Sequence, residues 1–192
     1  MATVPVPGSL KAEEFSRLDE VEGYRDELIE GERVLSPSPI LPHGAVVERL
    51  WLVLRGKLPE ISHEPLRVVM ESGWKFRNPA SGLDSVPTPD LMIVREADYR
   101  KALKQRGWFE GTPLMVIEVI SPSERKSRRL QKLGLYQEMG VPHILEADYT
   151  KREIQIHTPD LLRAAVYHAG DRMTSPFTAD IDEIFAVLDQ DE

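Results

Sequence analysis

One run of seven residues constrains the fold of this chain more than any other. The segment Leu114–Ile120 (LMVIEVI) is apolar on both of its alternating faces, apart from Glu118. A strand with two apolar faces is typical of the interior of a sheet that is covered on both sides. The run therefore predicts a central strand, and it places one ionisable side chain within that strand.

Helical spacing of apolar residues is found on both sides of this strand. Apolar side chains three and four positions apart predict a helix over 43–58, another over 124–139, and a third over 180–188 that Asp180 can cap. In the second helix we expect an apolar seam of Leu130, Leu133, Tyr136 and Met139. Helices near both ends of the chain are therefore expected to enclose the strands.

Shorter apolar runs predict the remaining strands. The candidates are a pair of strands around a turn in 27–34, a β-meander over 66–76, and single strands at 89–94, 143–147, 153–157 and 163–168. Together these elements predict an α/β (α+β) fold with a central mixed β-sheet flanked by helices.

Composition bounds the class of protein. With 192 residues, 41% hydrophobic and 29% charged, the chain suits one globular domain, and we expect a flexible N-terminus over 1–9 and a single domain over 10–192. The absence of Cys excludes disulfides, thiol nucleophiles and Cys-based zinc sites. No apolar run approaches the roughly 20 residues of a membrane span, and the N-terminus has no secretory pattern. We therefore expect a cytoplasmic protein that has no membrane partner.

Charge is distributed unevenly along the chain. The net charge of −8 argues against a protein that coats nucleic acid through bulk positive charge. Positive charge is nevertheless concentrated in 125–132 (RKSRRLQK), directly after the central run. Such a helix face is usually only solvated, but Lys132 neighbours the apolar seam and can be drawn toward the sheet.

Asp90 and Glu118 are the most informative polar residues. Asp90 opens a second apolar strand, and an ionised carboxylate in such a strand is costly to bury unless a cation compensates it. Two acids on neighbouring strands can converge on one hard cation, which can activate water and steady a phosphate. The alternative is that Asp90 caps a strand end and Glu118 forms a salt bridge with a basic residue.

An ordered set of motifs resembles the Uma-two family of bacterial restriction-endonuclease-like proteins, within the PD-(D/E)XK superfamily. The set comprises Pro89-Asp90, the segment Glu118–Ser123, Lys132, Tyr136 and Gly140-Val141, with further matches at 27–32, 36–39, His43, Asp148 and 175–185. The resemblance covers roughly Leu10 to Leu188.

The resemblance implies a restriction-endonuclease-like core and an endonuclease that hydrolyses DNA with Mg²⁺ or Mn²⁺. Asp90 and Glu118 are then the metal-binding acids. The superfamily usually places a lysine two residues after the second acid, where this chain has Ile120. In this family the lysine lies in the following helix, which implies that Lys132 holds the attacking water or stabilises charge on the phosphate.

Glu27 and His43 match recurrent positions of the same family. They are candidates for auxiliary metal ligands or for groups that orient the site. The alternative interpretation is that Glu27 is a strand-edge acid and His43 a helix-start histidine.

Two residues depart from the family pattern. Arg128 stands where an acid is common, and Glu146 lies in a strand that is usually aromatic and branched apolar. These departures give weight to an alternative function, a catalytically silent nuclease-fold protein that binds nucleic acid or a protein partner. Lys132 separates the two hypotheses, because the enzyme needs a lysine that reaches the Asp90–Glu118 cleft. A double-strand cut is most simply made by two copies, so a homodimer is a further expectation.

Overall fold

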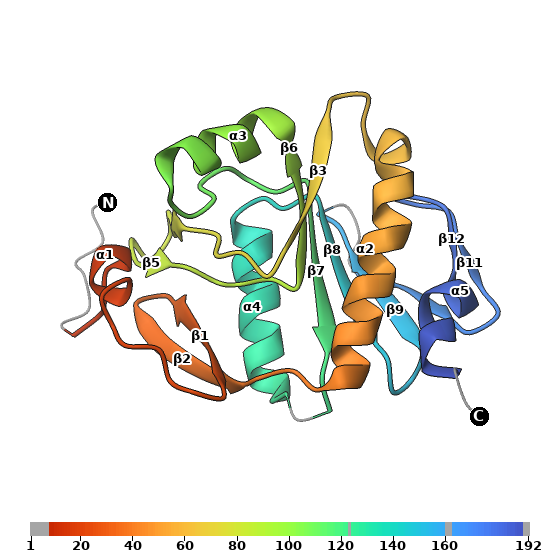
Figure 1. Ribbon diagram of the computed structural model, residues 1–192, viewed down its shortest axis with the longest axis horizontal. Coiled ribbons are helices and arrows are strands. Elements are labelled where there is room, and N and C mark those ends of the chain that lie inside the picture. Colours follow the sequence, from red (N-terminus) through yellow and green to blue (C-terminus); the bar gives the residue numbers. More distant parts are fainter. Residues whose placement is uncertain (1–7, 123, 160–162, 190–192) are drawn as a thin grey trace.

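The computed structural model describes residues 8–122, 124–159 and 163–189 (Figure 1). Its helices are α1 (Ala12–Phe15), α2 (Leu41–Ile61), α3 (Glu96–Gln105), α4 (Lys126–Glu138) and α5 (Ile181–Phe185), followed by the 3₁₀ helix η1 (Ala186–Asp189). Its strands are β1 (Tyr24–Ile29), β2 (Glu32–Pro37), β3 (Leu66–Met70), β4 (Phe76–Arg77), β5 (Asp84–Ser85), β6 (Leu91–Arg95), β7 (Met115–Ile120), β8 (His143–Asp148), β9 (Glu153–His157), β10 (Ala165–His168), β11 (Arg172–Met173) and β12 (Ala179–Asp180).

A six-stranded mixed sheet forms the centre of the fold, in the order β10-β9-β8-β7-β6-β3. The β7–β8 pair is parallel and the other neighbouring pairs are antiparallel. Strand β7 lies in the interior between β6 and β8, and Met115, Val116 and Ile117 are fully buried there. The predicted central strand and the predicted fold class are therefore confirmed.

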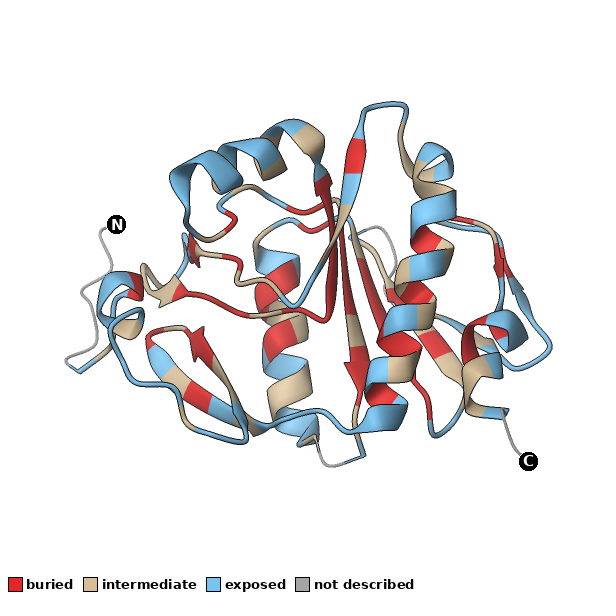
Figure 2. Ribbon diagram, in the orientation of Figure 1, coloured by how far each residue is buried: buried red, intermediate tan, exposed pale blue. Residues whose placement is uncertain are grey.

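Helices cover the two faces of this sheet unequally (Figure 1). Helices α2 and α5 pack on one face, where Leu50 and Ile184 join Ile117 in the larger core. Helix α4 packs on the other face, where Leu135 joins Val116 in a second core. Figure 2 shows the buried strands between helices whose outer sides are exposed. Because side chains alternate along a strand, Glu118 faces α4, as Val116 does.

A separate hairpin of β1 and β2 stands beside the main sheet (Figure 1). Its two-residue turn is Glu30-Gly31, and both residues have positive φ (49° and 78°), as a type I′ turn requires. A Cβ on Gly31 would lie 2.6 Å from the Cβ of Ser9, so this position has no room for a side chain. The hairpin confirms the strand pair predicted in 27–34.

The predicted β-meander over 66–76 is wrong. Strand β3 pairs with β6, whereas β4 pairs with β5 in a small sheet of its own. The chain leaves the main sheet at Glu71, whose left-handed conformation (φ 42°) directs it away from β3. Local alternation identified the strands, but it carries no information about which strand pairs with which.

The predicted seam of α4 is wrong at one end, because Leu130 is 53% exposed. The buried face carries Lys132, Leu135 and Tyr136 instead. A cation takes a core position on this helix because acidic side chains of the main sheet and of the β1–β2 hairpin face it, as described below. Asp180 stands at the N-cap position of α5, as predicted, but its side chain makes no capping hydrogen bond. Its carboxylate instead accepts hydrogen bonds from Arg172 at 2.9 and 3.0 Å.

The expectation for residues 1–9 falls mainly on residues 1–7, which lie outside the described residues. The single domain over 10–192 stays a prediction. Over the described ranges, no helix combines the length and the apolar character needed to cross a membrane.

Candidate active site

A cleft of about 660 Å³ opens beside the C-terminal end of β7. Its walls come from the β1–β2 hairpin, from the segment that leads into α2, and from the start of α4. All five residues singled out in the sequence line this cleft: Glu27, His43, Asp90, Glu118 and Lys132. Residues far apart in the sequence are thus brought to one place.

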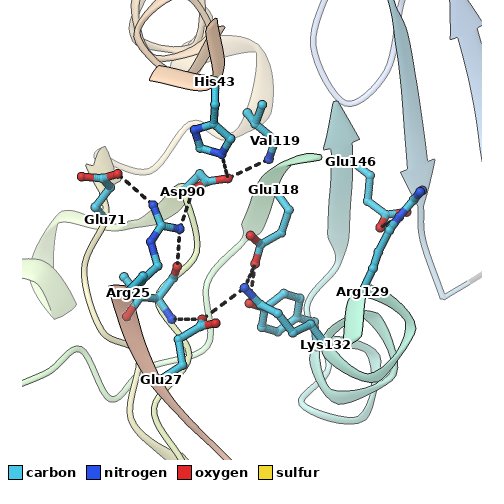
Figure 3. A network of polar contacts seen from close by, with 12 residues as sticks. Arg25, Glu27, His43, Glu71, Asp90, Glu118, Val119, Arg129, Lys132 and Glu146 are labelled. Atoms are coloured by element: carbon cyan, nitrogen blue, oxygen red, sulfur yellow. Dashed lines mark hydrogen bonds and ion pairs between the residues drawn. The ribbon is translucent and has the colours of Figure 1, made fainter. Parts of the chain in front are cut away.

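Asp90 precedes β6 and is 1% exposed. Its Oδ2 accepts the backbone N–H of Val119 at 2.8 Å and lies 3.2 Å from Nε2 of His43. Its Oδ1 accepts a hydrogen bond from Arg25 at 2.7 Å (Figure 3). Burial alone would raise the pKa of Asp90, but His43 and Arg25 outweigh it and lower that pKa to about 2. Asp90 is therefore an ionised carboxylate that is held in place by the backbone of Val119, the residue after Glu118.

Glu118 is held by two residues of α4. The ammonium of Lys132 lies 2.7 Å from Oε1 of Glu118, and the hydroxyl of Tyr136 donates to the same oxygen at 2.6 Å. Lys132 also lies 3.1 Å from Oε1 of Glu27, on the hairpin (Figure 3). The lysine therefore reaches the cleft, as the enzyme hypothesis requires.

The charges in the cleft are not balanced. Burial, reinforced by Asp90 and Glu27, raises the pKa of Glu118 to about 7, although Lys132 acts in the opposite direction. Burial alone would lower the pKa of Lys132, but Glu118 and Glu27 raise it above its usual value, so the amine stays protonated. Four carboxylates, those of Glu27, Glu71, Asp90 and Glu118, thus share the cations of Lys132 and Arg25. This excess of negative charge favours a further positive charge at Glu118.

The donor chemistry of these residues fits a hard divalent cation. In the part of the chain that the structure describes, no three His, Asp or Glu side chains are gathered as a ligand set. Arg25 and Lys132 lie against the carboxylates of Asp90 and Glu118. Mg²⁺ needs fewer protein ligands, because it usually keeps several waters and binds through one or two carboxylates. Asp90 and Glu118 supply that number on one cleft.

Sequence reasoning missed Arg25, and it gave Tyr136, a member of the family motif set, no role in the site. Arg25 bridges Asp90 and Glu71 through its two terminal nitrogens, at 2.7 and 2.9 Å. Arg25 lies two residues before Glu27 on β1, so the two side chains share one face of the strand. This spacing could have identified Arg25 as a member of the site. Tyr136 was assigned to an apolar seam, yet it lies four residues after Lys132 on the same helix face and presents its hydroxyl to Glu118.

The two departures from the family pattern have different surroundings. Arg128 lines the cleft and donates to the Gln131 side chain at 2.9 Å. Glu146 is 4% exposed and binds both Arg129 and His157. The ion pair with Arg129 and the contact with His157 account for the burial of Glu146 in this strand.

The fold is shared with a protein of solved structure. It matches a solved structure described as a putative nuclease belonging to DUF820 from Anabaena variabilis ATCC 29413, with a TM-score of 0.74 and 19% sequence identity. The match covers 93% of this chain and 99% of that chain.

A family model places the chain more narrowly. The model of Uma2, described as "Putative restriction endonuclease", matches residues 12–182. The chain therefore belongs to this family, and the resemblance found in its motifs is confirmed. The search of curated proteins gave no match.

Proposed function

We propose that this protein is a DNA endonuclease that requires a divalent cation, Mg²⁺ or Mn²⁺. Asp90 and Glu118 are the metal ligands and Lys132 is the catalytic cation. One observation carries the proposal: the Lys132 ammonium lies 2.7 Å from Glu118, in the cleft that Asp90 also lines. Membership of the Uma2 family and the nuclease-like fold support the same class of activity.

Each residue has a distinct role in this proposal. A bound divalent cation supplies an activated water and offsets charge on the phosphate. Asp90 is ionised and is fixed by the Val119 amide, so its carboxylate carries the negative charge that a cation ligand needs. Lys132 stays protonated, so it orients the attacking water or stabilises negative charge on the phosphate and is no general base.

Glu27 and His43 act as orienting groups. Glu27 accepts the Thr88 backbone N–H at 2.7 Å and directs Lys132 into the cleft. His43 is buried against Asp90, at the start of α2. Both contacts explain why an acid and a histidine stand at these positions.

One observation favours the alternative, a catalytically silent protein that binds nucleic acid or a protein partner. Arg25 and Lys132 already pair with Asp90 and Glu118, and an arrangement closed in this way needs no metal. A cleavage assay distinguishes the nuclease from the catalytically silent protein, because only the nuclease requires the divalent cation and Lys132.

Plasmid nicking with Mg²⁺ or Mn²⁺ tests the proposal. We expect the native protein to nick, and Glu118→Ala and Lys132→Ala to lose that activity. Arg129→Ala is the matched control, since it removes a cation from the same face of α4 that pairs with Glu146 instead. Activity that is indifferent to Glu118→Ala and Lys132→Ala would contradict the mechanism. The homodimer stays a prediction, which sedimentation velocity of the native protein tests.

A further inference from the structure

The walls of the cleft differ in chemistry above the carboxylates. One wall is the segment that leads from β2 into α2, where Leu35, Pro37, Pro39 and Ile40 line the cleft. Leu35 is 42% exposed and Ile40 is 60% exposed. Exposed apolar side chains gathered in a concave site are typical of a surface that binds a partner.

Arginines at the start of α4 line the same cleft. Arg125 is exposed, and Arg128 has a neutral hydrogen-bond partner in Gln131. Neither arginine forms a salt bridge within the described ranges, whereas Arg129 on the same helix is paired with Glu146. These two positive charges are therefore available to a ligand that is negative on one side.

An unpaired nucleic-acid strand has two chemically different sides, with phosphates along one and base faces along the other. A duplex hides its base faces in the stack, so it offers phosphates and groove edges to a protein. The cleft volume of about 660 Å³ is that of a pocket for a small molecule, and it suits one or a few nucleotides.

We propose that the cleft takes an unpaired DNA strand, whose bases pack on Leu35 and Ile40 and whose phosphates pair with Arg125 and Arg128. The proposal rests on the nuclease function above and names its substrate class: single strands, flaps, or bubbles within a duplex. The strand then passes over Asp90 and Glu118, which lie in the same cleft.

Charge complementarity predicts a modest salt dependence. Two phosphate contacts on a single strand give a slope of log Kobs against log salt of about −1.4, and the loss of one arginine reduces its magnitude by about 0.7. A protein with a net charge of −8 adds little unspecific attraction to this term.

Fluorescence anisotropy in EDTA tests binding without cleavage. The probes are a labelled single strand, the fully paired duplex of that strand, and the same duplex with a central bubble. We expect the single strand and the bubble to bind about tenfold or more tightly than the paired duplex. Equal or tighter binding of the paired duplex would overturn the proposal.

Two pairs of neighbouring variants test the walls. We expect Ile40→Ser to weaken single-strand binding by about 3- to 10-fold, because it removes apolar surface that a base would bury. Leu41→Ser is its control, because Leu41 is 86% exposed but does not line the cleft. Arg125→Ser should lower the salt slope, while Lys126→Ser, just outside the cleft, should not. If the two variants of a pair change binding equally, the role assigned to that wall of the cleft is contradicted.

Failure of this inference is distinguishable from failure of the nuclease proposal. Plasmid nicking that depends on Glu118, together with no preference for unpaired strands, would overturn the substrate class and leave the nuclease in place. Preference for unpaired strands without metal-dependent cleavage of any probe would support the strand site and overturn the catalytic proposal.

Discussion

Two acid–base pairs join the central sheet to α4, and they differ in how well each acid is compensated. Glu118 on β7 pairs with Lys132, and Glu146 on β8 pairs with Arg129. The two acids are direct neighbours in the parallel β7–β8 register, and the two cations are three residues apart on the helix. The pairs are therefore nearly equivalent in architecture, and their difference is one of local charge.

Arg129 and His157 both lie against the carboxylate of Glu146. Burial alone would raise the pKa of Glu146, but Arg129 and His157 outweigh it and lower that pKa. Arg129 reaches both carboxylate oxygens, which the planar guanidinium fork allows and a lysine ammonium does not. Both carboxylate oxygens of Glu146 are therefore paired, and the ion pair holds α4 on the sheet.

Glu118 shares its one cation with Glu27, and Asp90 adds further negative charge, so its pKa rises to about 7. The comparison shows how one helix face can carry both a structural pair and a proposed catalytic one. The acid with unmet charge is the one that lines the large cleft with Asp90.

The largest predicted difference between the pairs is in activity. Lys132→Ala should reduce the nicking rate by about 10²-fold or more, the usual cost of removing a preorganised charge at a reacting phosphate. Arg129→Ala should stay within a few-fold of the native rate. The comparison fails if Arg129→Ala costs as much activity as Lys132→Ala in protein of unchanged circular dichroism.

The second prediction concerns stability. Arg129→Ala leaves Glu146 buried with only His157, and it should cost about 1–3 kcal/mol, less than a fully buried pair because the guanidinium is partly exposed. The double variant Arg129→Met/Glu146→Leu replaces both charges and should recover most of that loss. Urea unfolding measures both values, and a double variant less stable than Arg129→Ala would contradict a purely structural pair.

The pH dependence of stability should have opposite signs at the two acids. The folded-state pKa of Glu118 lies above its ordinary value of 4.5, so the native state binds an extra proton, and the stability falls as pH rises from about 4.5 to 7. The effect is on the order of 2 kcal/mol. Glu146 has a lowered pKa, so its contribution is present above 4.5 and is lost as pH falls below that value.

Urea unfolding in EDTA at pH 5 and pH 8 measures the Glu118 part of this dependence. Glu118→Gln should flatten the curve between these two pH values, while Glu146→Gln should leave that difference unchanged. A native pH dependence that survives Glu118→Gln would show that another group carries it.

The smallest effect is expected from single hydroxyl groups. Tyr136→Phe removes a donor to Glu118 and should cost about 1 kcal/mol, with a few-fold loss of activity. Tyr149→Phe is the matched control, because its buried hydroxyl has no hydrogen-bond partner among the described residues, so its removal should be neutral or stabilising. Equal changes in the urea midpoint for both variants would contradict the role of Tyr136.

The local helices and strands and the acidic residues of the site could be predicted from the sequence. Periodicity located β7 and α4, and the cost of burying charge singled out Asp90 and Glu118. Strand pairing could not be predicted, because the alternation of apolar residues in 66–76 is the same whether β3 pairs with β4 or with β6. The partners of each acid were also beyond reach, since Arg25 and Tyr136 reach the site only through tertiary contacts.

Binding of Mn²⁺, followed by electron paramagnetic resonance, tests most directly the claim that unmet negative charge at Glu118 makes the metal site. The native protein should bind Mn²⁺, Glu118→Gln should bind it at least about tenfold more weakly, and Glu146→Gln should bind it as the native protein does. Equal Mn²⁺ affinity in the native protein and Glu118→Gln, or a loss confined to Glu146→Gln, would contradict the account.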